Sequence, residues 1–265
     1  MGRFSRLERG EKPEEKLDQE LLEKATERYD QPYFIEQADD LYFTGQYEKA
    51  LRFYSRALKL DNSQKYPWVG QILCLLEMNQ TKEAELWANR GLDIFPEDTS
   101  LISLQAVSYA HRGMVKRALG SSDYALQKGA TEFTWIARGE VLLLAHNKNS
   151  RFCFDKALEM AAADDWKTPI RIGMIYRRHK VYSRAITMFE NATQINVKNY
   201  YLWYLLGQCY QKVGFNRKAI EAFEKAVEFG PEFRTAEDAL VKAAHRSLFR
   251  RLFSRLFGGR APKNA

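Results

Sequence analysis

The sequence lacks what a membrane-spanning, exported or disulfide-bonded protein needs. Its longest apolar stretch without a charged residue, residues 199–211, is shorter than the ~18 residues required for a membrane helix. Residues 1–15 carry arginines but no apolar core and no small-residue cleavage site, so we expect no secretory export and a cytoplasmic location. The three cysteines stand far apart without a Cys-x-x-Cys pair, which indicates small core residues in a reducing compartment.

Local motifs of enzymes and metal sites are also missing. The four histidines form no His-Glu-x-x-His motif and have no cysteine or carboxylate at metal-ligand spacing. There is no phosphate-binding glycine loop and no Gly-x-Ser-x-Gly nucleophile elbow. We therefore expect no enzymatic activity, no cofactor and no metal, although residues distant in sequence can still meet in a fold.

The net charge of +7 is concentrated at the C-terminal end. From Arg234 onward there are eight Lys or Arg and two acidic residues, whereas residues 1–233 contain 33 and 32. This asymmetry indicates an acidic partner for the tail, which is an anionic membrane surface, an acidic protein or nucleic acid. Nucleic acid is the least favoured of these, because the nearly neutral body offers no extended basic face.

A unit of about 34 residues recurs along the chain. Small residues mark it in two registers, because Ala50, Ala84 and Ala118 are 34 residues apart, as are Gly139, Gly173 and Gly207. A third set is separated by 34, 34, 32, 35 and 34 residues: Ala57, Gly91, Ala125, Ala157, Ala192 and Ala226. Helices pack closely where Ala or Gly faces a bulky residue. The period therefore predicts repeated pairs of helices.

Helix-breaking residues agree with this period. Glycines fall in three of the expected turns, where a left-handed backbone suits glycine: Gly45, Gly113 and Gly214. Five prolines fall at expected helix boundaries: Pro32, Pro67 and Pro169 at the start of first helices, and Pro96 and Pro231 after second helices. The fourth cycle is the weakest, and we expect a short, irregular turn there before Ala157.

The last cycle resembles a tetratricopeptide repeat. It contains the full family signature: Trp203, Leu206, Gly207, Tyr210, Ala219, Phe223 and Pro231. The earlier cycles keep parts of this signature, so the resemblance covers about residues 31–233. It implies an all-α, right-handed solenoid of about six helix-turn-helix units with flanking cap helices. It also implies a non-enzymatic scaffold that binds a protein, peptide or helix in a concave groove lined by the first helix of each unit.

We expect four segments along the chain. Residues 1–30 form a charged segment with a cap helix, for which a separate partner-binding helix is the alternative. Residues 31–233 form the solenoid, residues 234–247 a capping helix, and residues 248–265 a basic amphipathic tail.

The groove-facing positions of the family are apolar in the early cycles of this chain, and basic and aromatic in the late ones. The candidate partner-binding residues are Leu73, Leu104, Val107, Lys167, Arg171, Met174, Arg178, Tyr201, Tyr204 and Gln208. Lys167, Arg171 and Arg178 line one stripe of a single expected helix and suit an acidic peptide. The alternatives are that this stripe is a solvated helix face and that the tyrosines pack between repeats.

Lys167 and Arg171 resemble the basic pair of carboxylate-clamp repeats that bind chaperones. The other positions of such a clamp hold Ser103, Val107 and Ala137 instead of lysine and asparagine. We therefore expect no complete clamp.

The tail is strongly amphipathic if it is helical. Its apolar half comprises Leu248, Phe249, Leu252, Phe253, Leu256 and Phe257, and its polar half comprises Arg250, Arg251, Ser254 and Arg255. Upstream, a stripe suited to capping the last repeat points roughly the opposite way: Ala236, Ala239, Leu240, Ala243 and Ala244. Either the chain bends near His245, or the Leu/Phe face binds something other than the last repeat.

Four roles for the tail follow from this pattern. It adsorbs to an anionic membrane surface, enters the groove of a partner, self-associates with a second copy, or bends back onto its own solenoid. Two functional hypotheses remain from the sequence. The chain is a scaffold whose tail places it on a membrane or assembly, or it is a peripheral membrane protein whose tail is the main functional element.

Overall fold

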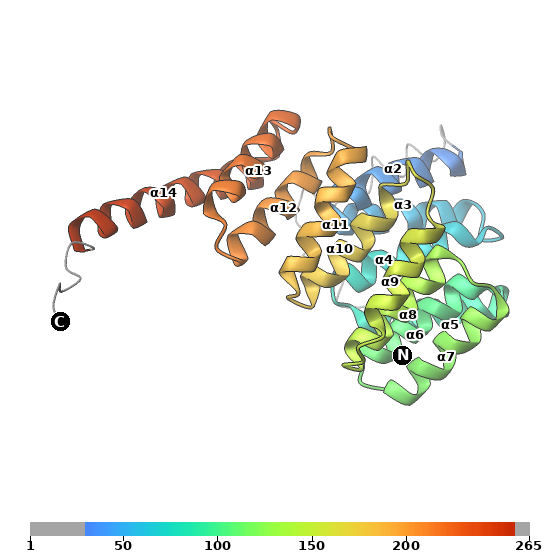
Figure 1. Cartoon of the computed structure of the whole chain (residues 1–265). Coiled ribbons are helices and arrows are strands. Elements are labelled where there is room, and N and C mark those ends of the chain that lie inside the picture. The colour runs from blue at the N-terminus through green and yellow to red at the C-terminus, as the bar shows by residue number, and fades with distance from the viewer. Residues whose placement is uncertain (1–29, 258–265) are drawn as a thin grey trace, which may run out of the picture. The chain divides into compact units, whose positions relative to one another are not determined.

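The computed structural model of this protein describes residues 30–257, with side chains described as far as His245. Within that range the chain forms thirteen helices and no strand (Figure 1). Their bounds are α2 (Gln31–Phe43), α3 (Tyr47–Leu60), α4 (Lys65–Glu77), α5 (Thr81–Ile94), α6 (Thr99–His111), α7 (Val115–Lys128), α8 (Glu132–Leu144), α9 (Ser150–Met160), α10 (Lys167–Arg178), α11 (Tyr182–Ile195), α12 (Tyr200–Lys212), α13 (Asn216–Phe229) and α14 (Arg234–Phe257). None of the described helices is long and apolar enough to cross a membrane.

Twelve of these helices form six helix-turn-helix pairs, from α2–α3 to α12–α13, which confirms the all-α repeat architecture. In five pairs the turn has three residues, and its middle residue is left-handed. These residues and their φ angles are Gly45 (77°), Asn79 (59°), Gly113 (78°), Lys180 (61°) and Gly214 (85°). The turn glycines expected from the sequence are thus confirmed, and an asparagine and a lysine adopt the same backbone in two other pairs.

The fourth pair differs from the expectation of a short turn. Its turn, residues 145–149, has five residues, and His146 takes the left-handed conformation with φ 54°. Helix α9 has 11 residues, whereas the other second helices have 14. The longer turn and the shorter helix nearly offset each other, so Ala157 still follows Ala125 by 32 residues.

The two helices of the last three pairs touch through a glycine on the first helix and a phenylalanine on the second. The contacts join Gly139 to Phe154, Gly173 to Phe189, and Gly207 to Phe223. A Cβ atom added at any of these glycines would lie 2.5 or 2.6 Å from the nearest ring carbon. Because protein interiors are close-packed, no larger residue fits there without displacing the ring.

The recurring small residues lie in the core, as the period predicts. All eight alanines of the first and third registers are fully buried: Ala50, Ala57, Ala84, Ala118, Ala125, Ala157, Ala192 and Ala226. Cys74, Cys153 and Cys209 are free thiols and are buried too, which confirms their expected role as small core residues.

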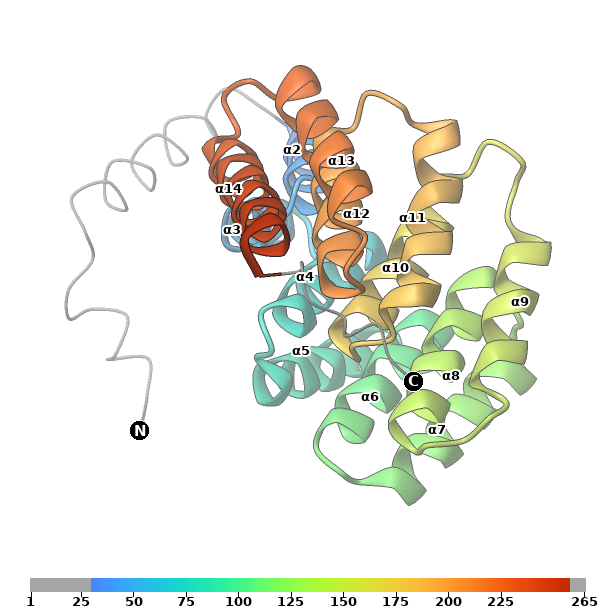
Figure 2. The same cartoon turned by 60° about the vertical axis from the view of Figure 1, so that its left-hand side comes forward.

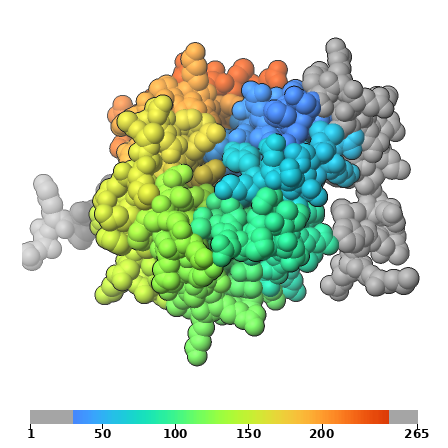
Figure 3. Space-filling model, turned by 90° about the vertical axis from the view of Figure 1, so that its right-hand side faces the viewer, coloured from blue at the N-terminus to red at the C-terminus, as the bar shows by residue number. Residues whose placement is uncertain are grey.

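The chain divides into two compact units. Unit 1 comprises Met1–Tyr42 and Gln46–Pro96, and unit 2 comprises Phe43–Gly45 and Glu97–Ala265. In unit 1, the Tyr66 hydroxyl donates a hydrogen bond to Asp39 Oδ2 at 2.7 Å. In unit 2, the surfaces of neighbouring helix pairs adjoin, and the space-filling view passes from green to yellow across them (Figure 3).

Helix α14 packs against α13 through its first half, where Ala236 and Ala243 are buried. Its 24 residues extend about 36 Å, whereas the 14 residues of α13 extend about 21 Å. The later part of α14 therefore continues beyond α13 (Figure 1), and Figure 2 shows α14 beside α13. The chain stays helical through His245, so the expected cap and the beginning of the expected tail belong to one helix.

Candidate ligand-binding face of the second unit

The candidate face lies on the first helices of the late pairs, and α10 supplies its basic residues. Asp165 positions the start of this helix, because its Oδ1 accepts hydrogen bonds from the backbone N–H groups of Lys167 at 2.8 Å and Thr168 at 3.3 Å. Such a carboxylate satisfies N–H groups that have no partner within the helix. Lys167, Arg171 and Arg178 are all half-buried on α10.

Arg171 is held against an aromatic ring from the neighbouring first helix. Its guanidinium carbon lies 5.7 Å from the centre of the Phe133 ring on α8. A cation–π contact of this kind contributes ~0.5–2 kcal/mol. The Arg171 Nε atom is buried and has no hydrogen-bond partner among the described residues. A buried donor without an acceptor carries a desolvation cost.

The aromatic residues of α12 are mostly packed among themselves. The rings of Tyr201 and Tyr204 lie 6.0 Å apart and nearly parallel, and Phe233 packs edge-on against Tyr204 at 5.1 Å. Gln208 Nε2 donates a hydrogen bond to the Tyr204 hydroxyl at 2.7 Å. Burial raises the pKa of Tyr204, and the nearby charge of Arg177 opposes this shift. Tyr204 and Gln208 are half-buried, whereas Tyr201 is a core residue.

The structure narrows the set of candidate residues from the sequence. Leu104, Val107 and Met174 are at most 2% exposed, so they offer a ligand almost no surface. Leu104 and Val107 are buried because α6 packs against both α7 and α8, which covers more than one face of the helix. Leu73 is half-buried and belongs to unit 1. The accessible candidates of unit 2 are Lys167, Arg171, Arg178, Tyr204 and Gln208.

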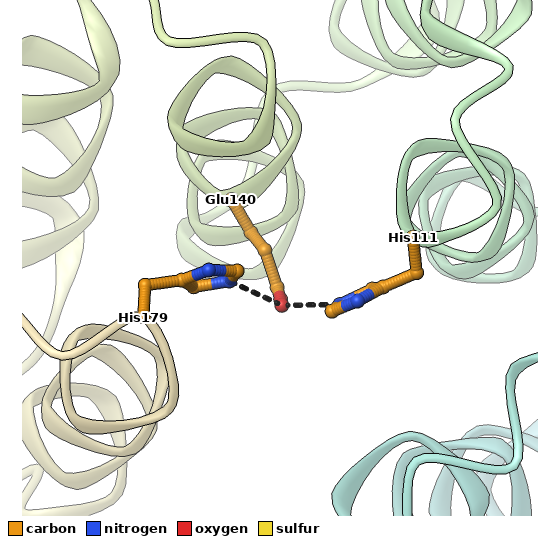
Figure 4. Close-up of side chains that lie close together, drawn as sticks. All are labelled: His111, Glu140 and His179. Carbon is orange, nitrogen blue, oxygen red and sulfur yellow. Dashed lines mark hydrogen bonds and ion pairs between the residues drawn. The ribbon is translucent and has the colours of Figure 1, made fainter.

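A buried carboxylate lies beside the basic stripe. The side chain of Glu140, on α8, is 6% exposed. Its Oε1 lies 2.9 Å from His111 Nε2, 3.2 Å from Arg178 Nη2 and 3.7 Å from His179 Nε2. Figure 4 shows the two imidazole rings reaching the carboxylate from opposite sides. The cluster thus joins groups from three successive helix pairs.

The electrostatics of this cluster keep Glu140 ionised. Burial acts to raise the pKa of Glu140, because desolvation disfavours a carboxylate. The charge of Arg178 and the hydrogen bond with His111 outweigh burial and hold the pKa of Glu140 well below its usual range. An ionised carboxylate only accepts hydrogen bonds, so His111 Nε2 donates in this pair.

Spacing along the chain does not reveal this cluster, because Glu140 follows His111 by 29 residues and precedes His179 by 39. The repeat contains a signal that a motif search misses. His111 and His179 are 68 residues apart, which is two periods of 34, and Glu140 lies in the pair between them. The expectation of no metal site relied on local spacing alone.

Other predicted elements lie outside the described residues. They are the N-terminal cap helix in residues 1–29 and the side chains of the tail, namely Leu248, Phe249, Arg250, Arg251, Leu252, Phe253, Arg255, Leu256 and Phe257. In the upstream capping stripe, Ala239, Leu240 and Ala244 are half-buried.

Comparison with known proteins agrees with the repeat pattern. Tetratricopeptide repeat family models match residues 35–99 and residues 200–233, and the second match is the cycle with the full signature. The chain carries tetratricopeptide repeats. Such repeats support a role as a protein–protein interaction scaffold.

Two curated proteins match parts of this tetratricopeptide repeat chain. Anaphase-promoting complex subunit 3 of Schizosaccharomyces pombe is 29% identical over 79 residues, which cover 30% of this chain and 12% of that protein. Protein O-mannosyl-transferase TMTC1 of Homo sapiens is 24% identical over 204 residues, which cover 76% of this chain and 20% of that protein. The chain therefore matches a fifth or less of the length of these relatives.

Among solved structures, YrrB is described as a tetratricopeptide repeat protein with an unusual peptide-binding site. It matches with a TM-score of 0.41 and 19% identity, over 70% of this chain and 96% of YrrB.

Proposed function

We propose that the chain is a non-enzymatic cytoplasmic scaffold that binds an acidic peptide along α8, α10 and α12 of unit 2. The observation that carries this proposal is Arg171, a half-buried residue whose guanidinium is held over the ring of Phe133. An ordered guanidinium recognises carboxylates well. Lys167 adds a second positive charge one helical turn earlier.

The spacing of these two cations favours an extended ligand. Lys167 and Arg171 are four residues apart on a helix, a rise of about 6 Å. Alternate side chains of an extended peptide are about 6.6 Å apart. Acidic residues at alternate positions therefore fit the pair. Arg178 is already paired with Glu140, so it has a smaller role in this proposal.

The remaining candidates have supporting roles. Tyr204 and Gln208, which hydrogen-bond to each other, border the face on α12. The buried Leu104, Val107 and Met174 then act as packing beneath the face rather than as contacts. Leu73 stays a candidate apolar contact of unit 1.

Binding of a labelled peptide with glutamates at alternate positions tests this proposal, with a glutamine version of the peptide as the probe control. The Lys167→Ala/Arg171→Ala double variant is expected to bind the glutamate peptide at least about tenfold more weakly, because charge-assisted hydrogen bonds contribute ~1.5–3 kcal/mol each. The Arg151→Ala/Lys156→Ala variant removes the same charge from the exposed side of α9 and should leave binding unchanged. Equal losses in both variants would show nonspecific attraction and overturn the proposal.

A second candidate function is docking on an anionic membrane through the end of α14. The helix is longer than the repeat helix it covers, and its sequence beyond His245 separates Leu and Phe from Arg. Co-sedimentation with anionic and neutral liposomes, at low and high salt, compares the full chain with one that stops at Ala244. The shorter chain keeps the buried contacts of Ala236 and Ala243 with the last repeat.

Salt-sensitive binding that is lost on truncation would support membrane docking as the role of the tail. If neither form binds liposomes, the membrane proposal fails. Sedimentation velocity of the same two forms then tests self-association through the tail.

A further inference from the structure

We propose that His111, Glu140 and His179 form a zinc-binding site with two imidazole ligands and one carboxylate ligand. The site lies wholly within unit 2, and its three residues come from three successive helix pairs. The proposal does not depend on peptide binding, because neither Lys167 nor Arg171 takes part in it.

The distances in the cluster fit a zinc ion. One ligand atom from each residue lies within 4.8 Å of the other two. Zinc–ligand bonds of about 2.0–2.1 Å in a tetrahedral arrangement separate the ligand atoms by about 3.3–3.5 Å. The two distances from Glu140 Oε1, 2.9 Å to His111 and 3.7 Å to His179, lie on either side of that range. Small side-chain rotations are therefore enough to close a site around an ion.

His179 shows that the cluster is incomplete as a hydrogen-bonded network. Its Nε2 atom is buried and has no hydrogen-bond partner among the described residues, although it faces the carboxylate. The main chain of His179 is fixed at the end of α10, because its N–H donates a hydrogen bond to the Ile175 carbonyl at 3.0 Å and the following Lys180 is left-handed. A metal ion between the three residues would satisfy this nitrogen, which would otherwise carry a desolvation cost.

The chemistry of the ligand set favours zinc over the harder divalent cations. Calcium and magnesium prefer all-oxygen ligands, whereas zinc takes imidazole nitrogen together with carboxylate oxygen. Two histidines and one glutamate leave a fourth position for water or another ligand. The side chains of His111 and His179 are 10% and 19% exposed, so the cluster is shielded but reachable.

Arg178 opposes zinc binding, because it is a cation that is already paired with Glu140, and this opposition provides a test of the proposal. Its Nη2 lies 3.2 Å from the same Glu140 oxygen. A guanidinium cannot act as a ligand, and its charge repels a dication. Zinc must therefore compete with Arg178 for the carboxylate. The Arg178→Gln variant is expected to bind zinc several-fold more tightly than the unchanged chain.

Zinc affinity of the full metal-free chain is measured by competition with a coloured chelator. The His111→Gln/His179→Gln variant should bind at least about tenfold more weakly, because even outer-shell changes at metal sites cost 10–100-fold. The matched control removes the two exposed histidines, as His146→Asn/His245→Gln, and should bind as the unchanged chain does. Asparagine suits position 146 because it tolerates the left-handed backbone found there.

Equal affinities of the two double variants would place zinc elsewhere and overturn the proposal, as would the absence of any binding by the unchanged chain. A zinc affinity that Arg178→Gln fails to raise would also contradict it.

A measurement on the unchanged chain covers the case in which a variant fails to fold. Imidazole nitrogen NMR signals of the four histidines are followed during zinc addition. The signals of His111 and His179 should move together at one equivalent, while those of His146 and His245 stay in place. Movement of the exposed pair instead would show adventitious binding and refute the site.

Discussion

Replacing Gly113 with alanine measures the backbone cost of the turn between α6 and α7. Gly113 has φ 78°, and a Cβ atom there would meet nothing within 4 Å. The substitution therefore adds no clash, and its cost is that of holding an L-residue in the left-handed region, roughly 1–2 kcal/mol. Alanine also restricts the unfolded chain, which returns about 0.4–1 kcal/mol. The expected net loss is about 1 kcal/mol.

The matched control is Gly120→Ala, seven residues later in α7. Gly120 is exposed, and a Cβ atom there also meets nothing within 4 Å, but its backbone is helical. Alanine should therefore stabilise the chain by about 0.5–1 kcal/mol. Lys180→Gly, in the equivalent turn of the fifth pair, should stabilise it as well because it relieves a left-handed lysine.

Urea unfolding followed by far-ultraviolet circular dichroism compares the free energies of unfolding of these variants. The reasoning predicts opposite signs for Gly113→Ala and Gly120→Ala, two substitutions that are chemically identical. Shifts of the same sign at both positions would refute the assignment of the cost to the turn.

Three further outcomes are expected from the structure. Glu140→Gln removes a buried charge that is paired with Arg178 and should lower the free energy of unfolding by roughly 3 kcal/mol, measured in urea. Gly173→Ala forces a Cβ atom to within 2.6 Å of the Phe189 ring and should cost about 1–3 kcal/mol; an additional Phe189→Leu change should recover part of this loss, and no loss at all would contradict the contact. Burial raises the pKa of Cys209 to about 12, so iodoacetamide at pH 8 should alkylate this thiol only in the unfolded chain, as mass spectrometry of the modified peptide can show.

The repeat architecture was predictable because each pair obeys the same local rules. A small residue is needed wherever two helices cross closely, and this need recurs with the period, so Ala50 and Ala84 are both fully buried. The turn requires a residue with a left-handed backbone, and glycine adopts this backbone most easily. Gly113 and Gly214 could therefore be predicted as turn positions. Each requirement is met by a single residue type at a fixed spacing, so the helix pairs can be found from the sequence alone.

The candidate face was predictable only in part. The sequence predicts a basic stripe through Lys167 and Arg171, because residues four apart share a helix face, and both residues lie on α10. The burial of Leu104 and Val107 was missed, because it depends on how many neighbours α6 has and not on its own periodicity. A helix packed on two sides buries positions that would face a ligand on a helix packed on one side.

The Glu140 cluster was missed for a different reason, and the repeat explains how it can be found. In a stack of repeats, each pair contacts mainly its immediate neighbours, so contacts between residues two periods apart are unusual. Here the rings of His111 and His179 lie 5.9 Å apart, on either side of a carboxylate from the pair between them. His111 and His179 are two periods apart along the chain and occupy adjacent positions of the third and fifth pairs: His111 lies two residues before the left-handed Gly113, and His179 lies one residue before the left-handed Lys180. The fourth pair has no polar side chain at either position, because Leu144 and Ala145 stand there before the left-handed His146. Glu140 stands five residues before Ala145 on α8, and its long side chain reaches both rings. A search that compares residues by period, rather than by distance along the chain, therefore identifies the histidine pair and points to the helix that must bridge it.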